Sequence, residues 1–148
     1  MLDLSIHKDI AAPPARVFAV ASDLRGAAGR IRAITKMEVL TDGPIRIGTR
    51  FRETRKMFGR EATEEMEVLE MDPPRALAFG CESNGFRYRM RMSFSPQGTG
   101  TQMQMRFQAE ALTFFGKVMG TLMKPFAKKM MSGCGKDLDD IAAIAEGR

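Results

Sequence analysis

The segment FRYRMRMSFSPQGTGTQMQMRFQAE (residues 86–110) decides the fold, because nearly every second side chain in it is apolar. Phe86, Tyr88, Met90, Met92 and Phe94 share one face of its first half, and Met103, Met105, Phe107 and Ala109 share one face of its second half. Arginine, serine and glutamine side chains occupy most of the alternate positions, and Gln97-Gly98-Thr99-Gly100 supplies a turn. This period of two predicts antiparallel strands over 86–95 and 101–110, each with one buried and one solvated face.

Strand patterns continue on the N-terminal side of this hairpin. Turn residues separate four further strand-like runs, at 34–41, 48–57, 60–71 and 75–82. The Asn84-Gly85 pair before the hairpin is a strong turn signal. Residues 2–10 also alternate, so the sequence predicts seven strands, six of them consecutive. On the solvated faces, a cross-strand charge ladder is expected between two arginines and three glutamates: Arg50, Arg52, Glu61, Glu65 and Glu67.

Helical patterns occupy the remaining parts of the chain. Pro13-Pro14 ends the first strand and starts a helix, since proline is tolerated in a first helical turn, and residues 23–32 predict a turn and a second short helix. From Leu112 to Ala145, apolar side chains recur every three or four positions, which predicts a long amphipathic helix. Pro125 is expected to kink or split that helix, because an interior proline removes a backbone hydrogen bond.

The order of these elements predicts an α+β fold. A twisted antiparallel sheet with one apolar face needs a cover, and the C-terminal helix is the only long candidate. We therefore expect a seven-stranded curved antiparallel sheet, built from a strand, two short helices and six strands, wrapped around a long C-terminal helix. The 148 residues are expected to form a single domain (1–148), which at this size buries roughly 70% of its unfolded surface.

Composition argues against several classes of function. No apolar run approaches the roughly 20 residues of a membrane-spanning helix, and the N-terminal segment is unlike a signal peptide, so a cytoplasmic protein is expected. The net charge is +5, but the basic residues are dispersed and no nucleic-acid-binding motif is present, so no nucleic-acid partner is expected. One histidine and two cysteines without metal-ligand spacing predict no metal and no cofactor.

Two segments carry a resemblance to a known family. APPARVFAVASDL (residues 12–24) follows the first strand, KDLDDIAAIAEG (136–147) lies near the end of the chain, and Gly48-Thr49 opens a strand. With the element order, these segments resemble the START-like or Bet v 1-like helix-grip superfamily, and within it the bacterial polyketide cyclase/dehydrase and lipid-transport proteins. The tryptophan that many relatives carry after the second helix is absent here, and Ile31 or Ile34 takes roughly its place.

The resemblance implies a pocket between the sheet and the long helix that takes up hydrophobic small molecules. Thirteen methionines and ten phenylalanines suit such a lining, because the flexible methionine side chain adapts to ligands of varied shape. The expected lining is Phe51, Met66, Phe79, Cys81, Tyr88, Met90, Met92, Met103, Met105, Phe107, Met119, Leu122, Met123 and Phe126. The alternative is that these side chains meet and fill the space themselves.

Few residues are candidates for catalysis. Glu53 and Arg55 are expected on the face that carries Phe51, and Glu64 on the face that carries Met66. Charges on an apolar wall are costly unless they are paired. This trio is therefore an acid/base group, a salt bridge at the pocket mouth, or a set of side chains that a register bulge places in solvent. The Tyr88 hydroxyl either bonds a ligand carbonyl or finds a partner in a packed core.

Three functions are compatible with the sequence. The first is a monomeric or weakly dimeric protein that binds a lipid, an aromatic or a polyketide-like molecule. The second is a cyclase, aromatase or dehydratase in which Glu53 or Glu64 moves protons while Arg55 or Tyr88 stabilises an enolate-like oxygen. The third is a protein-interaction domain with a filled core, in which an unpaired stripe of Arg87, Arg89 and Arg91 and the lysine-rich last helix meet a partner.

Overall fold

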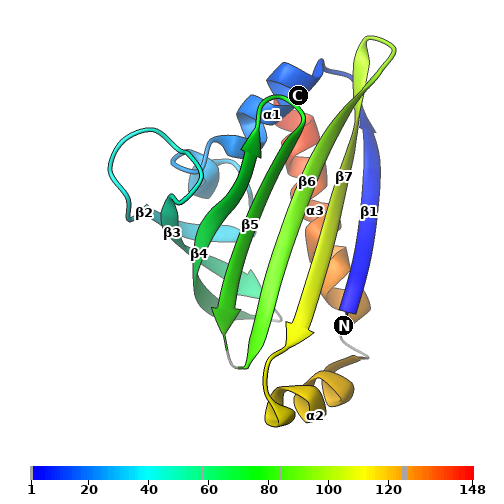
Figure 1. The fold of residues 1–148 in the computed structure, drawn as a ribbon. Helices are drawn as coiled ribbons and strands as arrows, with labels where there is room; N and C mark the ends of the chain where they lie inside the picture. Colours follow the sequence, from blue (N-terminus) through cyan, green and yellow to red (C-terminus); the bar gives the residue numbers. More distant parts are fainter. Residues whose placement is uncertain (1, 58, 84, 125–126) are drawn as a thin grey trace.

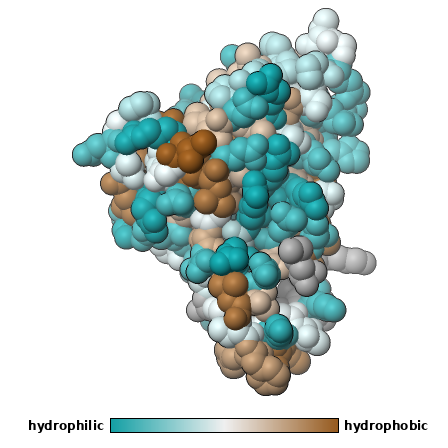
Figure 2. All heavy atoms as spheres, viewed as in Figure 1, coloured by the Kyte–Doolittle hydropathy of each residue, from teal (hydrophilic) through white to brown (hydrophobic). Residues whose placement is uncertain are grey.

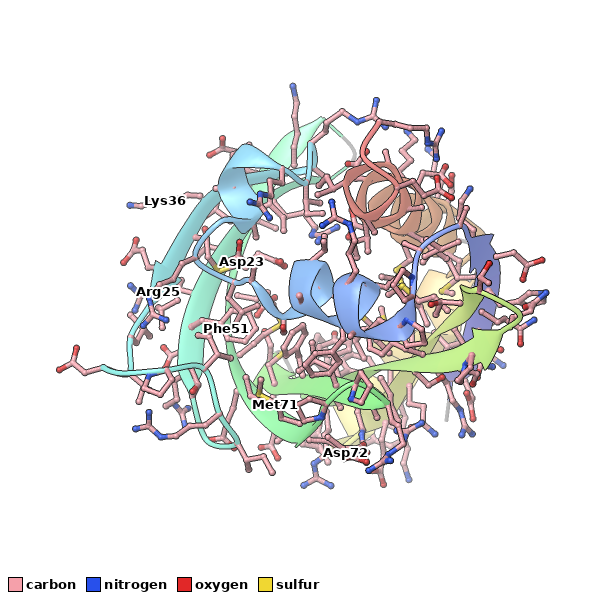
Figure 3. All side chains as sticks on the ribbon, turned by 90° about the horizontal axis from the view of Figure 1, so that it is seen from above. Asp23, Arg25, Lys36, Phe51, Met71 and Asp72 are labelled. Atoms are coloured by element: carbon pink, nitrogen blue, oxygen red, sulfur yellow. The ribbon has the colours of Figure 1, made fainter. Side chains whose placement is uncertain are left out.

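A single antiparallel sheet contains all seven strands, in the spatial order β1-β7-β6-β5-β4-β3-β2. The computed structural model describes residues 2–57, 59–83, 85–124 and 127–148. Its strands are β1 (Leu2–Ile10), β2 (Ile34–Val39), β3 (Arg50–Met57), β4 (Arg60–Asp72), β5 (Ala76–Ser83), β6 (Phe86–Gln97) and β7 (Gly100–Ala111). The predicted α+β fold is confirmed, and every strand lies within two residues of its expected bounds. Figure 3, a view from above, shows the sheet curving around the helices.

The first two helices connect β1 to β2. Helix α1 (Pro14–Ser22) begins at a proline, as predicted, and buries Val17 and Phe18. The short 3-10 helix η1 (Ala27–Gly29) follows it. The guanidinium of Arg16 donates hydrogen bonds to the backbone carbonyls of Ile144 and Ala145, so α1 holds the end of the C-terminal helix.

Helix α3 (Ala127–Ala145) is the helix that the sheet grips. It lies behind the sheet in Figure 1, on the concave side, and packs against β1 and α1. Its apolar stripe of Leu138, Ile141, Ala142 and Ala145 is buried, as the helical period predicts. On its flank, the Asp140 carboxylate accepts hydrogen bonds from the backbone and the side chain of Arg32 at 3.0 and 2.9 Å, which ties α3 to the segment before β2.

The predicted C-terminal helix is divided into two helices. Helix α2 (Phe114–Met123) sits at the end of the sheet beyond β7, while α3 runs behind it (Figure 1). The grip is therefore made by α3, and the apolar period of residues 112–122 does not face the core. Pro125, the expected point of division, lies outside the described residues. No helix in the described part of the chain has both the length and the apolar character needed to cross a bilayer.

Charged pairs cover the outer face of the sheet. Arg50 pairs with Glu65 and Glu67 at 3.3 and 3.1 Å, which confirms most of the expected ladder, although Glu61 stands opposite Lys56 instead. The arginine stripe of β6 is not unpaired, which corrects the expectation for a partner surface. Its three members reach neighbouring glutamates: Arg87 pairs with Glu82 and Glu110, and Arg89 and Arg91 pair with Glu70.

Candidate functional site

One end of the concave face is closed by packing. Leu77, Phe94 and Met103 are at most 2% exposed, and Phe18 of α1 meets Phe94 edge-on with ring centroids 5.5 Å apart. Met92 and Met105 are also buried between them. We call these residues of β5, β6 and β7 the closed end; their side chains are surrounded by protein and leave no surface for a ligand.

The same face is accessible at its other end. Side chains that point inward from β4 to β7 are only half-buried there, although they belong to the interior of the fold. We call this region the open end: Met66, Phe79, Cys81, Phe86, Tyr88, Met90 and Phe107. The Tyr88 ring stacks on Phe86 with centroids 5.8 Å apart and lies 5.9 Å from Phe107, so three aromatic rings form a continuous strip. Flat aromatic surface that solvent reaches inside a fold is suited to apolar ligands.

A buried charge cluster lies between the sheet and α3. The Arg55 guanidinium of β3 donates to Asp137 Oδ2 of α3 at 2.7 Å and lies 3.4 Å from Glu53 Oε2. The side chains of these three residues are between 12% and 21% exposed. The second oxygen of the Asp137 carboxylate, Oδ1, is buried and has no hydrogen-bond partner among the described residues. We call Glu53, Arg55 and Asp137 the charge cluster.

The environment of the charge cluster perturbs its titration. Burial raises the pKa of the Asp137 carboxyl above its ordinary value, and the opposing attraction of Arg55 does not cancel this effect. Burial disfavours the charged form of Arg55, but the carboxylates of Glu53 and Asp137 outweigh it and hold the pKa of the guanidinium above its ordinary value. The neighbouring Cys134 thiol, on the same helix as Asp137, has its pKa raised to about 11, mainly by burial.

The charge cluster and the open end are electrostatically linked. Burial and the charge of Glu64 raise the pKa of the Tyr88 phenol. Burial, Glu64 and Glu53 raise the pKa of the Cys81 thiol to about 11. Glu64 stands opposite Glu53 in the β3–β4 register and makes no hydrogen bond or ion pair with any described residue. The carboxylates therefore act on the same wall that presents the aromatic strip.

The structure divides the expected lining residues into four groups. Phe51, Met92, Met103 and Met105 are packed core. Met66, Phe79, Cys81, Tyr88, Met90, Phe107 and Met119 are half-buried, six of them in the open end. Leu122 is 64% exposed on the outer side of α2, so its expected place in the lining is wrong. Phe126 lies outside the described residues, as does the side chain of Met123.

Sequence reasoning missed Asp137 and Cys134, which α3 brings to the charge cluster. The sequence holds only a partial signal: Cys134, Leu138 and Ile141 form an apolar stripe that flanks position 137, but Asp139 and Asp140 lie beside the same stripe. The Asp137 carboxylate reaches Arg55 of β3, whereas Asp139 is exposed and pairs with Lys8 of the edge strand β1 at 2.8 Å. In the described part of the chain, no three His, Cys, Asp or Glu side chains are placed to hold a metal ion.

A shallow hollow lies elsewhere, between β1 and α3. It has a volume of about 230 Å³ and is lined mainly by Ile6, Lys8, Met131 and Leu138. None of the expected site residues borders it, so it is separate from the open end.

The sequence matches a family model over nearly its whole length. The model describes polyketide cyclase/dehydrase and lipid transport, and residues 1–146 match it. The chain belongs to this family. The open end and the charge cluster are therefore features of a member of the polyketide cyclase/dehydrase and lipid-transport family. No curated protein sequence matches the chain significantly.

Solved structures confirm the helix-grip architecture. The protein TTHA0849 from Thermus thermophilus superposes with a TM-score of 0.77 at 24% identity, covering 95% of this chain and 94% of that one. The Zhui aromatase/cyclase from Streptomyces sp. R1128 gives 0.77 at 18% identity, covering 98% and 93%. A START superfamily protein from Mycobacterium smegmatis gives 0.74 at 17% identity, covering 95% and 96%. At these identities the likeness establishes the fold, and the START-like resemblance of the sequence is confirmed.

Proposed function

We propose that this member of the polyketide cyclase/dehydrase and lipid-transport family binds a hydrophobic small molecule at the open end. The observation that carries the proposal is the half-buried state of inward-pointing apolar side chains, which include Tyr88, Met90 and Phe107. In a packed core such side chains are covered on all sides, as Met103 is. A lipid, an aromatic or a polyketide-like molecule supplies the missing cover.

The chemistry of the wall favours a ligand with flat or flexible apolar surface. Burial of apolar area contributes about 25 cal/mol per Å², and aromatic stacking on the strip adds orientation. Met66 and Met90 adapt to irregular shapes because the thioether chain has several low-energy rotamers. The Tyr88 hydroxyl and Glu64, both half-buried at the same wall, are polar anchors for a ligand that carries a hydroxyl or a carbonyl group.

A thermal-shift screen tests the proposal. The panel contains fatty acids, flavonoids, naphthols and polycyclic ketones. A ligand at about 100 times its dissociation constant stabilises the folded state by about 2.7 kcal/mol, which raises the melting temperature by several degrees at this chain length. We expect a shift for one chemical class, and no shift across the panel would indicate a filled core.

A matched pair of tryptophan variants assigns the binding to the concave face. Cys81 and Glu82 are neighbours on β5 whose side chains point to opposite faces of the sheet. Cys81→Trp places a large ring in the open end and is expected to abolish the ligand-induced shift. Glu82→Trp places the same ring on the outer face and should leave the shift intact. Equal shifts in both variants would contradict the proposed site.

A second candidate function, cyclisation with loss of water, is supported by the charge cluster. Aldol-type ring closure needs a base that removes a proton next to a carbonyl, a cation near the resulting oxyanion, and an acid for the departing hydroxyl. Glu53, Glu64 and Asp137 are carboxylates for the proton transfers, and Arg55 is the cation. Asp137 is suited to proton exchange, because burial raises its pKa and its buried Oδ1 has no hydrogen-bond partner among the described residues.

Turnover of a bound polyketide-like ligand tests the enzymatic candidate. The reaction would release one water for each ring closed and dehydrated, which mass spectrometry detects directly. We expect Asp137→Asn, Glu53→Gln and Glu64→Gln to bind the ligand with little change while at least one of them loses turnover. Binding without any product from the unmodified protein would reject the enzyme and leave the binding function standing.

A further inference from the structure

Helix α2 exposes an unusual amount of apolar surface. Phe114, Phe115 and Leu122 are 82%, 69% and 64% exposed, and Val118 is exposed as well, as is Leu112 just before the helix. Five of the eight large apolar side chains that are exposed in the described residues therefore lie within eleven positions of the chain. Figure 2 shows one group of apolar atoms at the lower end of the molecule, where Figure 1 places α2. Clusters of this kind mark interaction sites.

The seating of α2 explains why its apolar side faces outward. The helix contacts the β5–β6 turn through glycines: an added Cβ at Gly116 would lie 2.7 Å from the Gly85 carbonyl oxygen, and one at Gly120 would lie 3.2 Å from the Phe86 ring. Thr113 caps the helix by accepting a hydrogen bond from the Gly116 amide at 3.0 Å. The narrow glycine edge thus meets the protein, and the broad phenylalanine and leucine side is left to solvent, the reverse of an ordinary surface helix.

The net charge of the whole chain is concentrated in the same region. Residues 111–136 contain five lysines and no acidic residue, whereas the rest of the chain has 18 basic and 18 acidic side chains. Lys117 and Lys124 belong to this set, lie on one side of α2, and are exposed. Neither ammonium forms an ion pair with a described residue, while the arginines of the outer sheet face are paired with glutamates.

We propose that α2 docks this protein onto an anionic lipid bilayer, with Phe114, Phe115 and Leu122 in the interface and lysines at the headgroups. A short helix with exposed phenylalanine and leucine on one side and lysine on another is the pattern of interfacial membrane anchors. Docking to a second copy of the chain is disfavoured, because it would bring together two lysine-rich segments whose sequence contains no acidic residue. The helix also projects from the end of the sheet (Figure 1), and deformable acyl chains receive such a ridge without a preformed groove.

The position of α2 links membrane contact to the open end. Gly120 lies against the ring of Phe86, the first residue of the aromatic strip. A bilayer bound to α2 would therefore lie next to the site proposed for the apolar ligand. The docking itself does not depend on any ligand, so it is tested on the protein alone.

A single introduced tryptophan reports the docking, since the chain has none. Phe115→Trp is expected to show a blue-shifted emission with vesicles of phosphatidylcholine and phosphatidylglycerol, and little change with pure phosphatidylcholine. Ile47→Trp is the matched control, because Ile47 is 62% exposed in the segment between β2 and β3. The control emission should be unchanged by either vesicle, and a blue shift of the control alone would overturn the proposal.

Charge reversal tests the electrostatic part in the Phe115→Trp background. Lys117→Glu with Lys124→Glu should weaken vesicle binding by at least the roughly fivefold per lysine expected near an anionic surface. Arg25→Glu with Lys36→Glu changes the net charge equally at exposed positions near the β2 edge, labelled in Figure 3, and should weaken it much less. High salt should also release the protein from the vesicles.

The alternative occupant of this face is a second copy of the chain. If the unmodified protein formed a dimer, bound no vesicles, and became monomeric in the Phe114→Ser and Phe115→Ser variant, the face would be a subunit interface and the proposal would be overturned.

Discussion

At the residue scale, Arg55 is the central group of the charge cluster. Its guanidinium lies between Glu53 and Asp137 and is only 21% exposed, so its removal leaves two carboxylates near each other with little solvent. Breaking a buried ion pair from one side is strongly destabilising, because the remaining charge keeps its desolvation cost. We expect Arg55→Met to lower the free energy of unfolding by about 3 kcal/mol in urea titrations.

The control for Arg55 comes from the outer sheet face. Arg89 pairs with Glu70 at 3.2 Å, but its side chain is 44% exposed. Exposed pairs contribute between about 0 and 1 kcal/mol, so Arg89→Met should change stability by no more than this. If the two variants were equally stable, the charge cluster would have no special role in the fold.

The raised pKa of Asp137 gives a pH dependence of unusual sign. A carboxyl whose pKa is higher in the folded than in the unfolded state binds its proton more tightly when folded, so its contribution to stability grows as the pH falls. Asp3, Glu38 and Glu70 have lowered pKa values and lose their contribution as the pH falls. The Asp137→Asn variant has no carboxyl group at this position, so its stability lacks this pH-dependent contribution.

The measurement is urea unfolding of the unmodified protein and of Asp137→Asn at about pH 7 and at lower values down to about pH 4. For each pH we subtract the free energy of unfolding of the variant from that of the unmodified protein. We expect this difference to become more positive as the pH falls through the raised pKa of Asp137 toward the ordinary pKa of an aspartate. Parallel pH profiles for the two proteins would contradict a perturbed Asp137.

Asp137 also marks the limit of prediction at this scale. Glu53, Arg55 and Glu64 could be placed on inner faces because a strand alternates with a period of two. The KDLDD stretch offers three carboxylates within four residues, and their burial depends on the rotation of α3 against the sheet. Whether a side chain is buried or half-buried also depends on packing in three dimensions. Met90 and Met103 therefore differ in exposure although both occupy the same alternating pattern in the sequence.

At the scale of elements, the β5–β6 turn determines where α2 sits. Gly85 has a φ of +81°, its carbonyl accepts the Leu112 amide at 2.8 Å, and an added Cβ would lie 2.8 Å from the Thr113 hydroxyl oxygen. Gly85→Ala therefore adds a clash at the α2 cap to the cost of a left-handed alanine, and we expect a loss of at least about 2 kcal/mol.

Gly98→Ala is the matched control for this turn. Gly98 has a φ of +61°, but an added Cβ would meet nothing within 4 Å. Only the backbone strain applies there, and it costs about 1 kcal/mol. Urea unfolding of both variants gives the comparison, and an equal loss would show that the contact with Thr113 is unimportant.

The two C-terminal helices show why strands were predicted better than helices. Strand bounds follow from turn residues and alternation, both of which are local. The three- and four-residue period from Leu112 to Ala145 is also local, but it does not reveal which partner the apolar side meets. For Leu138 and Ile141 the partner is the core, and for Phe115 and Leu122 no described part of the protein covers the side chain. A covering C-terminal helix was therefore predicted correctly, but the period could not show that only its second half, α3, covers the sheet.

At the scale of the whole molecule, the concave face is asymmetric between its closed and open ends. Met103 and Met90 provide a matched test, because both are methionines that point inward from the paired strands β7 and β6. Met103 is fully buried, whereas Met90 is half-buried beside Phe107. Truncation of a fully buried methionine removes its transfer energy and leaves a cavity, at a cost of about 2–5 kcal/mol. A half-exposed methionine loses less, about 1 kcal/mol.

The two truncations should have opposite effects on stability and on binding. Met103→Ala is expected to lower the free energy of unfolding strongly while it leaves ligand affinity nearly unchanged, since the closed end has no surface for a ligand. Met90→Ala should be mildly destabilising and should weaken the binding of an apolar ligand, because it removes part of the open wall. Urea unfolding without ligand and titration calorimetry with it measure the two effects separately. Equal destabilisation by both substitutions, together with unchanged affinity, would mean that the face is packed from end to end and would reject the open end as a ligand site.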